Sequence, residues 1–238
     1  MKTLGLVLAL LVVGSGACVA TSVTIDLYSP ANSQLNYICA PLVPFNPNPM
    51  VVFAGADPEY NLYRWDAPTQ NPFYFEQGGE FGNILLGDGY YLSNGGSAAS
   101  ISYDGVPDGV PDSGGIMTDM WISLPGKQTD AFVDPPDGGG KHLIGQPFDH
   151  DTPTNGPGAT GDNIWFTDGT TLKTWEEAYN ADWVQSAMEY WDAPTQNPMT
   201  MTYQGWGNDD TLRAKTAYWL FTKKDNIALI IPAYNPPP

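Results

Sequence analysis

The chain has 238 residues, and its 9 Lys plus Arg against 26 Asp plus Glu give a formal net charge of −17. A surface this acidic repels phosphates and anionic headgroups, which excludes nucleic acid and anionic lipid as natural partners. The 26 Gly, the 22 Pro and an aromatic fraction of 13% predict short aromatic strands joined by many turns. This composition also argues against a disordered chain.

The first twenty residues have the features of a secretory signal. Lys2 gives a positive start, and an apolar run of about ten residues follows from Leu4 to Val13. That run is about half the length of a bilayer span, and the small residues after it allow cleavage after Ala17 or Ala20. We therefore predict a signal peptide over residues 1–20, no membrane span elsewhere, and a secreted, extracellular or cell-surface protein.

Cys18 leaves a lipid anchor open, because a lipoprotein signal would place an acylated cysteine at the new N-terminus. Ser15 stands where such signals usually carry an aliphatic residue, which favours plain secretion. After cleavage at Ala20, Cys39 is the only cysteine left, so no internal disulfide can form. Cys39 lies in an apolar run, and we expect a small buried side chain there.

Strand candidates recur along the mature chain as short apolar or alternating runs between turn residues. Those outside the repeated segments below are Val23–Tyr28, Ala99–Tyr103, Met120–Leu124, Asn163–Thr167 and Ile227–Ile231. One helix is expected over 172–187, where large apolar residues recur on one face. The Asn-Pro-Asn-Pro turn at 46–49 is expected to open a shorter helical turn.

An octapeptide, Trp-Asp-Ala-Pro-Thr-Gln-Asn-Pro, occurs at 65–72 and again at 191–198. Two further pairs of segments also match: Gly89–Leu92 with Ala217–Leu220, and Tyr37–Pro41 with Leu143–Pro147. A repeat of this size is one supersecondary unit used twice. We therefore predict two tandem repeats, each with an apolar strand, a hairpin around the octapeptide and a closing aromatic strand.

These patterns predict an all-β fold of mainly antiparallel, sandwich-like or barrel-like sheets with one short helix. The expected organisation is a signal peptide (1–20), a first repeat (21–125), a Gly/Asp-rich connector (126–141), a second repeat (142–234) with a helical insert (172–187), and a Pro-rich tail (235–238). The tail cannot join a central strand, because proline has no N–H to donate.

Within the octapeptide, Pro fixes φ while Asp and Asn bond to their own backbone, which predicts a hairpin loop. The residues that define this structural repeat are Trp65, Asp66 and Pro68 in the first copy and Trp191, Asp192 and Pro194 in the second. The equivalent positions of the two tryptophans favour a shared structural role. A sugar-stacking platform built on Trp65 and Trp191 stays open as an alternative.

Several of these segments together resemble a duplicated module of secreted and cell-surface proteins of environmental bacteria. The matching segments are Leu35–Pro44, Tyr63–Pro68, Gly89–Leu92, Trp121–Pro125, Leu143–Phe148, Asp168–Gly169 and Leu229–Pro232. Gln146 departs from that group, which often has Asn at this position. The resemblance implies a location outside the cell and an architecture, and it implies no particular chemistry.

Few residues suggest chemistry. His150 lies between two aspartates without a nucleophile motif nearby, and we expect it to be a solvated loop residue. Asp104, Asp108 and Asp112 recur every four residues in a glycine-containing stretch, which fits a calcium loop because Ca²⁺ takes about six to eight oxygen ligands. The alternative is a plain acidic connector, since the spacing is not that of an EF-hand.

The sequence therefore favours a secreted, non-enzymatic structural or surface protein, with no cofactor apart from the calcium alternative. It would self-assemble into a filament or coat if Val23–Tyr28 or Ile227–Ile231 added a strand to a neighbouring copy. Two alternatives stay open. One is a carbohydrate-binding module with a polysaccharide partner, and the other is a secreted hydrolase, for which spacing singles out no pair of carboxylates.

Overall fold

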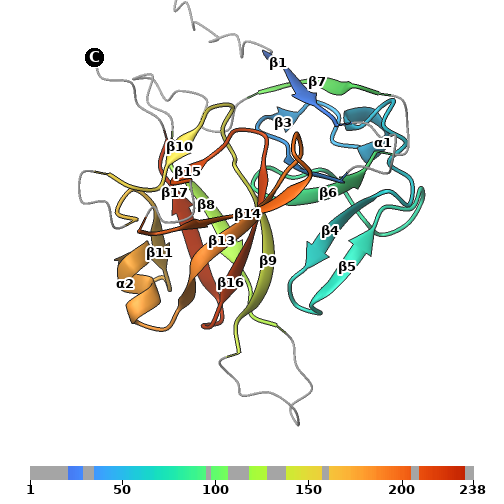
Figure 1. Ribbon diagram of the computed structural model, residues 1–238. Coiled ribbons are helices and arrows are strands. Elements are labelled where there is room, and N and C mark those ends of the chain that lie inside the picture. Colours follow the sequence, from blue (N-terminus) through green and yellow to red (C-terminus); the bar gives the residue numbers. More distant parts are fainter. Residues whose placement is uncertain are drawn as a thin grey trace, which may run out of the picture.

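The computed structural model describes residues 21–28, 35–94, 98–106, 118–127, 138–156, 161–204 and 209–233 (Figure 1). This described part contains 17 strands and two short helices, so the predicted all-β class is confirmed. The first part of the chain forms β1 (Thr21–Asp26), β2 (Leu35–Cys39), β3 (Val43–Pro44), α1 (Pro49–Val52), β4 (Leu62–Asp66), β5 (Asn71–Tyr74), β6 (Gly89–Ser93) and β7 (Ser100–Val106).

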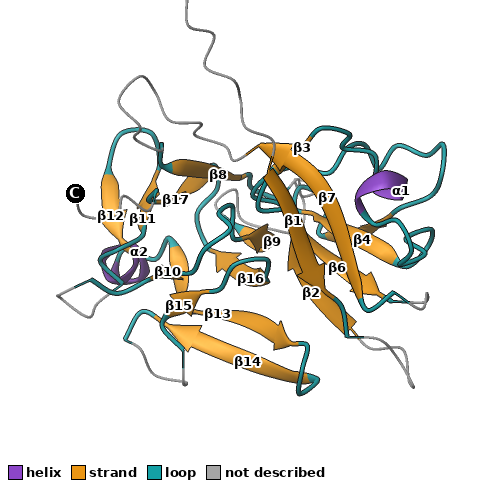
Figure 2. Ribbon diagram, turned by 90° about the horizontal axis from the view of Figure 1, so that it is seen from above, coloured by secondary structure: helices purple, strands orange, loops and turns teal. Residues whose placement is uncertain are grey.

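The second part of the chain contains the other ten strands and the second helix. They are β8 (Met120–Leu124), β9 (Gly140–Gly145), β10 (Thr152–Pro153), β11 (Trp165–Thr167), β12 (Leu172–Thr174), α2 (Trp175–Asn180), β13 (Val184–Asp192), β14 (Asn197–Thr202), β15 (Thr211–Leu212), β16 (Ala217–Thr222) and β17 (Ile227–Ile231). Figure 2 shows the two parts side by side, with α1 and β4 at one end of the molecule and β11 and β12 at the other.

The first part is a sandwich of two antiparallel sheets with strand orders β1-β7-β3 and β2-β6-β4-β5. Strand β7 alternates exposed and buried residues, so Ile101 and Tyr103 point to the interior. They join Val23 of β1 in one core with Tyr90 and Leu62 of the other sheet. Asn48 opens α1 by accepting a hydrogen bond from the N–H of Met50, which confirms the short helical turn expected after residues 46–49.

The second part has two four-stranded antiparallel sheets, ordered β12-β11-β17-β8 and β14-β13-β16-β9, and a small β10-β15 ladder. The apolar run of β17 is central in its sheet, and its buried Leu229 contributes to a second core. Trp175, Phe166 and Tyr218 are fully enclosed in this same core. Each part therefore has its own hydrophobic interior.

The two parts share one arrangement of strands. In chain order the four-stranded sheets contain β2, β4, β5 and β6 in the first part, and β9, β13, β14 and β16 in the second. In both sheets the strand that comes first in the chain lies at one edge. The fourth, the second and the third strands follow it in that order across the sheet. In the other layer, β7 lies between β1 and β3 as β17 lies between β8 and β11.

The helix expected over 172–187 is present but shorter than predicted, because only Trp175–Asn180 is helical. Thr174 caps α2 through a capping box with Glu177, which stabilises a helix start at Trp175. Asp182 then takes a left-handed φ of 61°, which ends the helix before β13. The flanking residues form β12 and β13 instead.

The position of β8 changes the boundary between the two parts. The sequence placed Met120–Leu124 in the first repeat, yet β8 pairs with β17, and its Ile122 and Leu124 lie in the second core. The second part therefore begins before β8. Strand β17 is paired on both edges, so it cannot add to a neighbour's sheet as the sequence suggested. In the described residues, no helix is long and apolar enough to cross a membrane.

Candidate functional site

The two octapeptides fold into the same hairpin loop. Asp66 Oδ2 accepts a short hydrogen bond from the hydroxyl of Thr69, and the corresponding bond joins Asp192 and Thr195. In each loop the last residue is a glutamine with a φ near 55°, and its side-chain amide donates to the carbonyl three residues earlier at 2.6 Å. The hairpin predicted from the octapeptide is confirmed in both places.

The glutamine of each loop also binds an edge strand of the other part's four-stranded sheet. Gln70 Nε2 donates to the carbonyl of Lys141 at 3.1 Å, and the Lys141 N–H donates to Gln70 Oε1 at 2.8 Å. Gln196 forms the same pair with Leu35, at 3.2 and 3.1 Å. We call Gln70–Lys141 and Gln196–Leu35 the glutamine clasps. Each clasp satisfies backbone groups on β9 or β2, the edge strands of their sheets.

Backbone contacts continue this exchange between the two parts. Isolated bridges join Ile38 to Thr216 and Asp88 to Ile144. Gly145 is required at this junction, because a Cβ there would lie 2.3 Å from the Cβ of Cys39. Cys39 is buried, as predicted, and its Sγ lies 3.1 Å from the Gln146 carbonyl. Burial raises the pKa of the Cys39 thiol well above its usual range.

The repeat tryptophans lie in this junction, half-buried. Trp65 packs edge-to-face on Trp219 of the second part, with ring centroids 5.1 Å apart. Trp191 lies 6.2 Å from Tyr37 of the first part. Both repeat tryptophans thus contact an aromatic ring across the junction, which accords with a structural role for them.

Each octapeptide loop also lines a cleft of about 260 Å³ between the parts. The first cleft contains Asp88, whose carboxylate lies 3.9 Å from Arg64. Desolvation raises the pKa of Asp88 to about 6, and the positive charge of Arg64 opposes this rise. His142, on the same cleft, is only 4% exposed, and burial lowers its pKa to about 4, so the ring is neutral.

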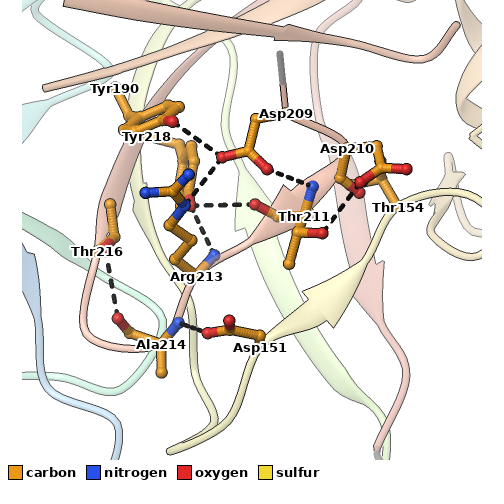
Figure 3. Close-up of polar contacts among 10 residues, drawn as sticks. All are labelled: Asp151, Thr154, Tyr190, Asp209, Asp210, Thr211, Arg213, Ala214, Thr216 and Tyr218. Atoms are coloured by element: carbon orange, nitrogen blue, oxygen red, sulfur yellow. Dashed lines mark hydrogen bonds and ion pairs between the residues drawn. The ribbon is translucent and has the colours of Figure 1, made fainter. Parts of the chain in front are cut away.

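The wall of the second cleft is held by a polar network around Asp209 (Figure 3). Asp209 accepts a hydrogen bond from the Tyr190 hydroxyl at 2.8 Å and pairs with Arg213 at 2.9 Å. The guanidinium also lies over the Tyr190 ring, 5.5 Å from its centroid. Desolvation, followed by the Asp209 hydrogen bond, raises the pKa of Tyr190 to about 12. These contacts fix the loop that carries Arg213.

The aspartates around His150 also have structural partners. Asp149 pairs with Lys215 at 3.3 Å, and Asp151 accepts from the N–H of Ala214 at 2.8 Å. His150 stacks on the ring of Phe148 at 5.2 Å and is half-buried, so it is less solvated than predicted. This cluster holds the chain against the loop shown in Figure 3.

The predicted calcium loop falls largely outside the described residues. Asp104 lies at an exposed position of β7, and its carbonyl accepts the N–H of Phe45 at 3.0 Å. Asp108 and Asp112 lie outside the described ranges. Among the residues that are described, no group of three His, Cys, Asp or Glu side chains could hold a metal ion.

An exposed aromatic site lies elsewhere, on the outer face of the β12-β11-β17-β8 sheet. Register places Trp121 of β8, Ile230 of β17 and Trp165 of β11 in one row across adjacent strands. Trp121 is 59% exposed and Ile230 only 5%, so the isoleucine forms a floor beside the tryptophan. Together with a neighbouring loop, these side chains line a groove of about 460 Å³. We call it the Trp groove.

The loop beside the Trp groove is held rigidly by one carboxylate. Asp168 Oδ1 accepts from the N–H groups of Thr170 and Thr171, at 3.1 and 2.9 Å, and from the Thr170 hydroxyl at 2.8 Å. Its other oxygen accepts from Lys224 at 2.6 Å. The lysine, followed by these donors, lowers the pKa of Asp168 well below its usual range. Gly169 has a φ of 86°, which suits this tight turn.

The sequence interpretation did not single out the Trp groove. A signal was present in Met120–Leu124, where Ile122 and Leu124 alternate with Trp121. If the two aliphatic residues point inward, the tryptophan must point outward. Trp165 is placed on the same face by its pairing with Ile230, which the sequence could not specify.

Comparison with known proteins gives no match for this chain: none of the protein-family models, curated proteins or solved structures matches it.

Proposed function

We propose that this protein is an extracellular, non-enzymatic protein that binds polysaccharide through the Trp groove. The observation that carries the proposal is the exposed Trp121 in register with Trp165 on one face of a sheet. Trp121, Ile230 and Trp165 form one apolar row, and contiguous apolar surface of this kind often marks a binding site. Sugar rings have apolar C–H faces that pack on aromatic rings.

The rim of the Trp groove supports a sugar rather than a purely apolar ligand. Thr170 and Thr171 are exposed along one side, and Asp119 is exposed at another. Hydroxyl and carboxylate groups around an apolar floor can bind sugar hydroxyls and fix their orientation. Because Asp168 already holds the threonine loop, little conformational entropy would be lost on binding.

Location outside the cell is part of the proposal. Its support is the signal-like N-terminus and the resemblance to secreted bacterial modules. A lipid anchor at Cys18 would place the same binding protein on the cell surface. We further propose that the two parts are copies of one module, because they share the octapeptide, the strand order and the glutamine clasps.

Self-assembly by strand addition remains a second candidate. Strand β1 is at the edge of its sheet and pairs only with β7 in the described residues. Its residues alternate in burial, as an added strand requires. Polysaccharide binding has the stronger support, because it accounts for the exposed tryptophan and edge-strand pairing does not.

Polysaccharide binding can be tested by affinity electrophoresis of the full chain through gels that contain a panel of soluble polysaccharides. At least one polysaccharide should retard the chain. Trp121→Ala or Trp165→Ala should each lower the affinity for that polysaccharide about tenfold to a hundredfold, as expected for a stacking hot spot. Phe45→Ala is the matched control, because Phe45 is also 59% exposed but lies in the first part. Retardation by none of the panel, or equal loss in the control, would contradict the proposal.

A further inference from the structure

We infer that the Trp groove takes an uncharged, equatorially linked polysaccharide chain that runs across the strands and presents alternate sugars to Trp121 and Trp165. The inference rests on the proposed function and names the class of glycan. Three features of the groove lead to it: the register of the row, the charge of the lining, and the burial of the residue between the tryptophans.

Register fixes the spacing between the two stacking positions. Trp121 pairs with Ile230, and Ile230 pairs with Trp165, so β17 separates the tryptophans. Adjacent strands lie about 4.8 Å apart, which puts the two tryptophan backbones about 9.6 Å apart. One pyranose unit in an extended, equatorially linked chain is about as long as one strand spacing. The tryptophans therefore match sugars that are separated by one unit.

The middle of the row suits the sugar between them. Ile230 is 5% exposed, so it presents a low floor between the tryptophans. A chain that stays extended can cross this floor, whereas an axially linked chain curves away from a flat sheet. Beyond Trp165 the row continues to Thr174 of β12, and Leu172, which is 57% exposed, lies on the same strand and face. This end of the groove gives room for one more unit.

Charge selects against acidic sugars. Among the described residues that line the Trp groove, Asp119 is the only charged side chain. Lys224, which lies between β16 and β17, is already paired with Asp168 of the neighbouring loop at 2.6 Å. The whole chain also has a formal net charge of −17. A uronic acid chain would meet like charge at the groove, whose described lining residues include no cation, and a net negative charge on the protein as a whole.

Isothermal titration calorimetry on the full chain tests this with oligosaccharides of one to six units. The probes are β-1,4-linked glucose, mannose, xylose and N-acetylglucosamine oligomers, with β-1,4-glucuronic acid oligomers for charge and α-1,4-glucose oligomers for shape. We expect an uncharged β-1,4 series to bind tightest. Its affinity should rise at least about tenfold from the disaccharide to the trisaccharide or tetrasaccharide and then level off.

Single variants separate the two stacking positions. Trp121→Ala and Trp165→Ala should each lower trisaccharide affinity about tenfold and remove most of the gain over the disaccharide. Phe45→Ala should leave all affinities unchanged. Circular dichroism spectra that match the parent chain exclude misfolding as the cause of a loss.

Three outcomes would overturn the inference. If glucuronic acid or α-1,4 oligomers bind tightest, the class of glycan is wrong while the proposed function stands. If a monosaccharide binds as tightly as the trisaccharide, the site takes chain ends instead of alternate sugars. If no oligosaccharide and no polysaccharide binds, the proposed function fails together with this inference.

Discussion

Replacing Gln196 with alanine tests whether the glutamine clasps hold the two parts of the molecule together. The side chain makes two hydrogen bonds to Leu35, of 3.2 and 3.1 Å, in addition to the bond to its own loop. A hydrogen bond contributes about 0.5–1.5 kcal/mol net to stability, and the side chain is only half-buried. We therefore expect Gln196→Ala to lower the free energy of unfolding by about 1–2 kcal/mol. Gln70→Ala should have a similar effect, because its clasp has the same geometry.

Urea unfolding followed by tryptophan fluorescence measures these changes. Both glutamines have a φ near 55°, and alanine bears the same backbone strain there. A difference in unfolding free energy therefore comes from the lost side-chain contacts. The exposed Gln77 provides the matched control, and Gln77→Ala should change stability by less than about 0.5 kcal/mol. The two clasps use separate partners, so the double variant should show nearly the sum of the single effects. Clasp variants that are as stable as Gln77→Ala would refute this account of the junction.

Three other predictions concern titration, reactivity and the network around Asp209. Because the pKa of Asp88 is raised to about 6, its contribution to stability is present at low pH and is lost as pH rises from about 4 to 6. Urea titrations should show this fall relative to Asp88→Asn, and a constant difference would contradict it. In a Cys18→Ser background, Cys39 should react with Ellman's reagent only in denaturant, since burial raises its pKa; labelling of the native protein would count against this. Tyr190→Phe should lower the free energy of unfolding by about 1–2 kcal/mol because Asp209 loses a buried donor, and an unchanged urea midpoint would argue otherwise.

Local structure could be predicted from the sequence where local chemistry determines it. The octapeptide hairpins follow from Pro, Asp and Asn, whose effects act within four residues. Cys39 was expected to be buried because apolar residues surround it in sequence. The helix expected over 172–187 is shorter than predicted for a local reason too, since Thr174 is a better N-cap than an interior helix residue.

Pairing across the chain could not be predicted. Met120–Leu124 follows the first part directly, but its partner β17 lies about a hundred residues later, and nothing in its own sequence specifies that distance. The Trp groove depends on the same pairing, because Trp121 and Trp165 meet only through β17. Trp65 and Trp191 were candidates for sugar stacking because they repeat in the sequence, yet their rings pack across the junction between the parts.

The most direct test of the account is to follow the indole N–H signals of the eight tryptophans by two-dimensional NMR while a binding polysaccharide is added. The account predicts shifts at Trp121 and Trp165, with the fully enclosed Trp175 unchanged. Shifts confined to Trp65 and Trp191 would move the binding site to the junction and contradict the central claim.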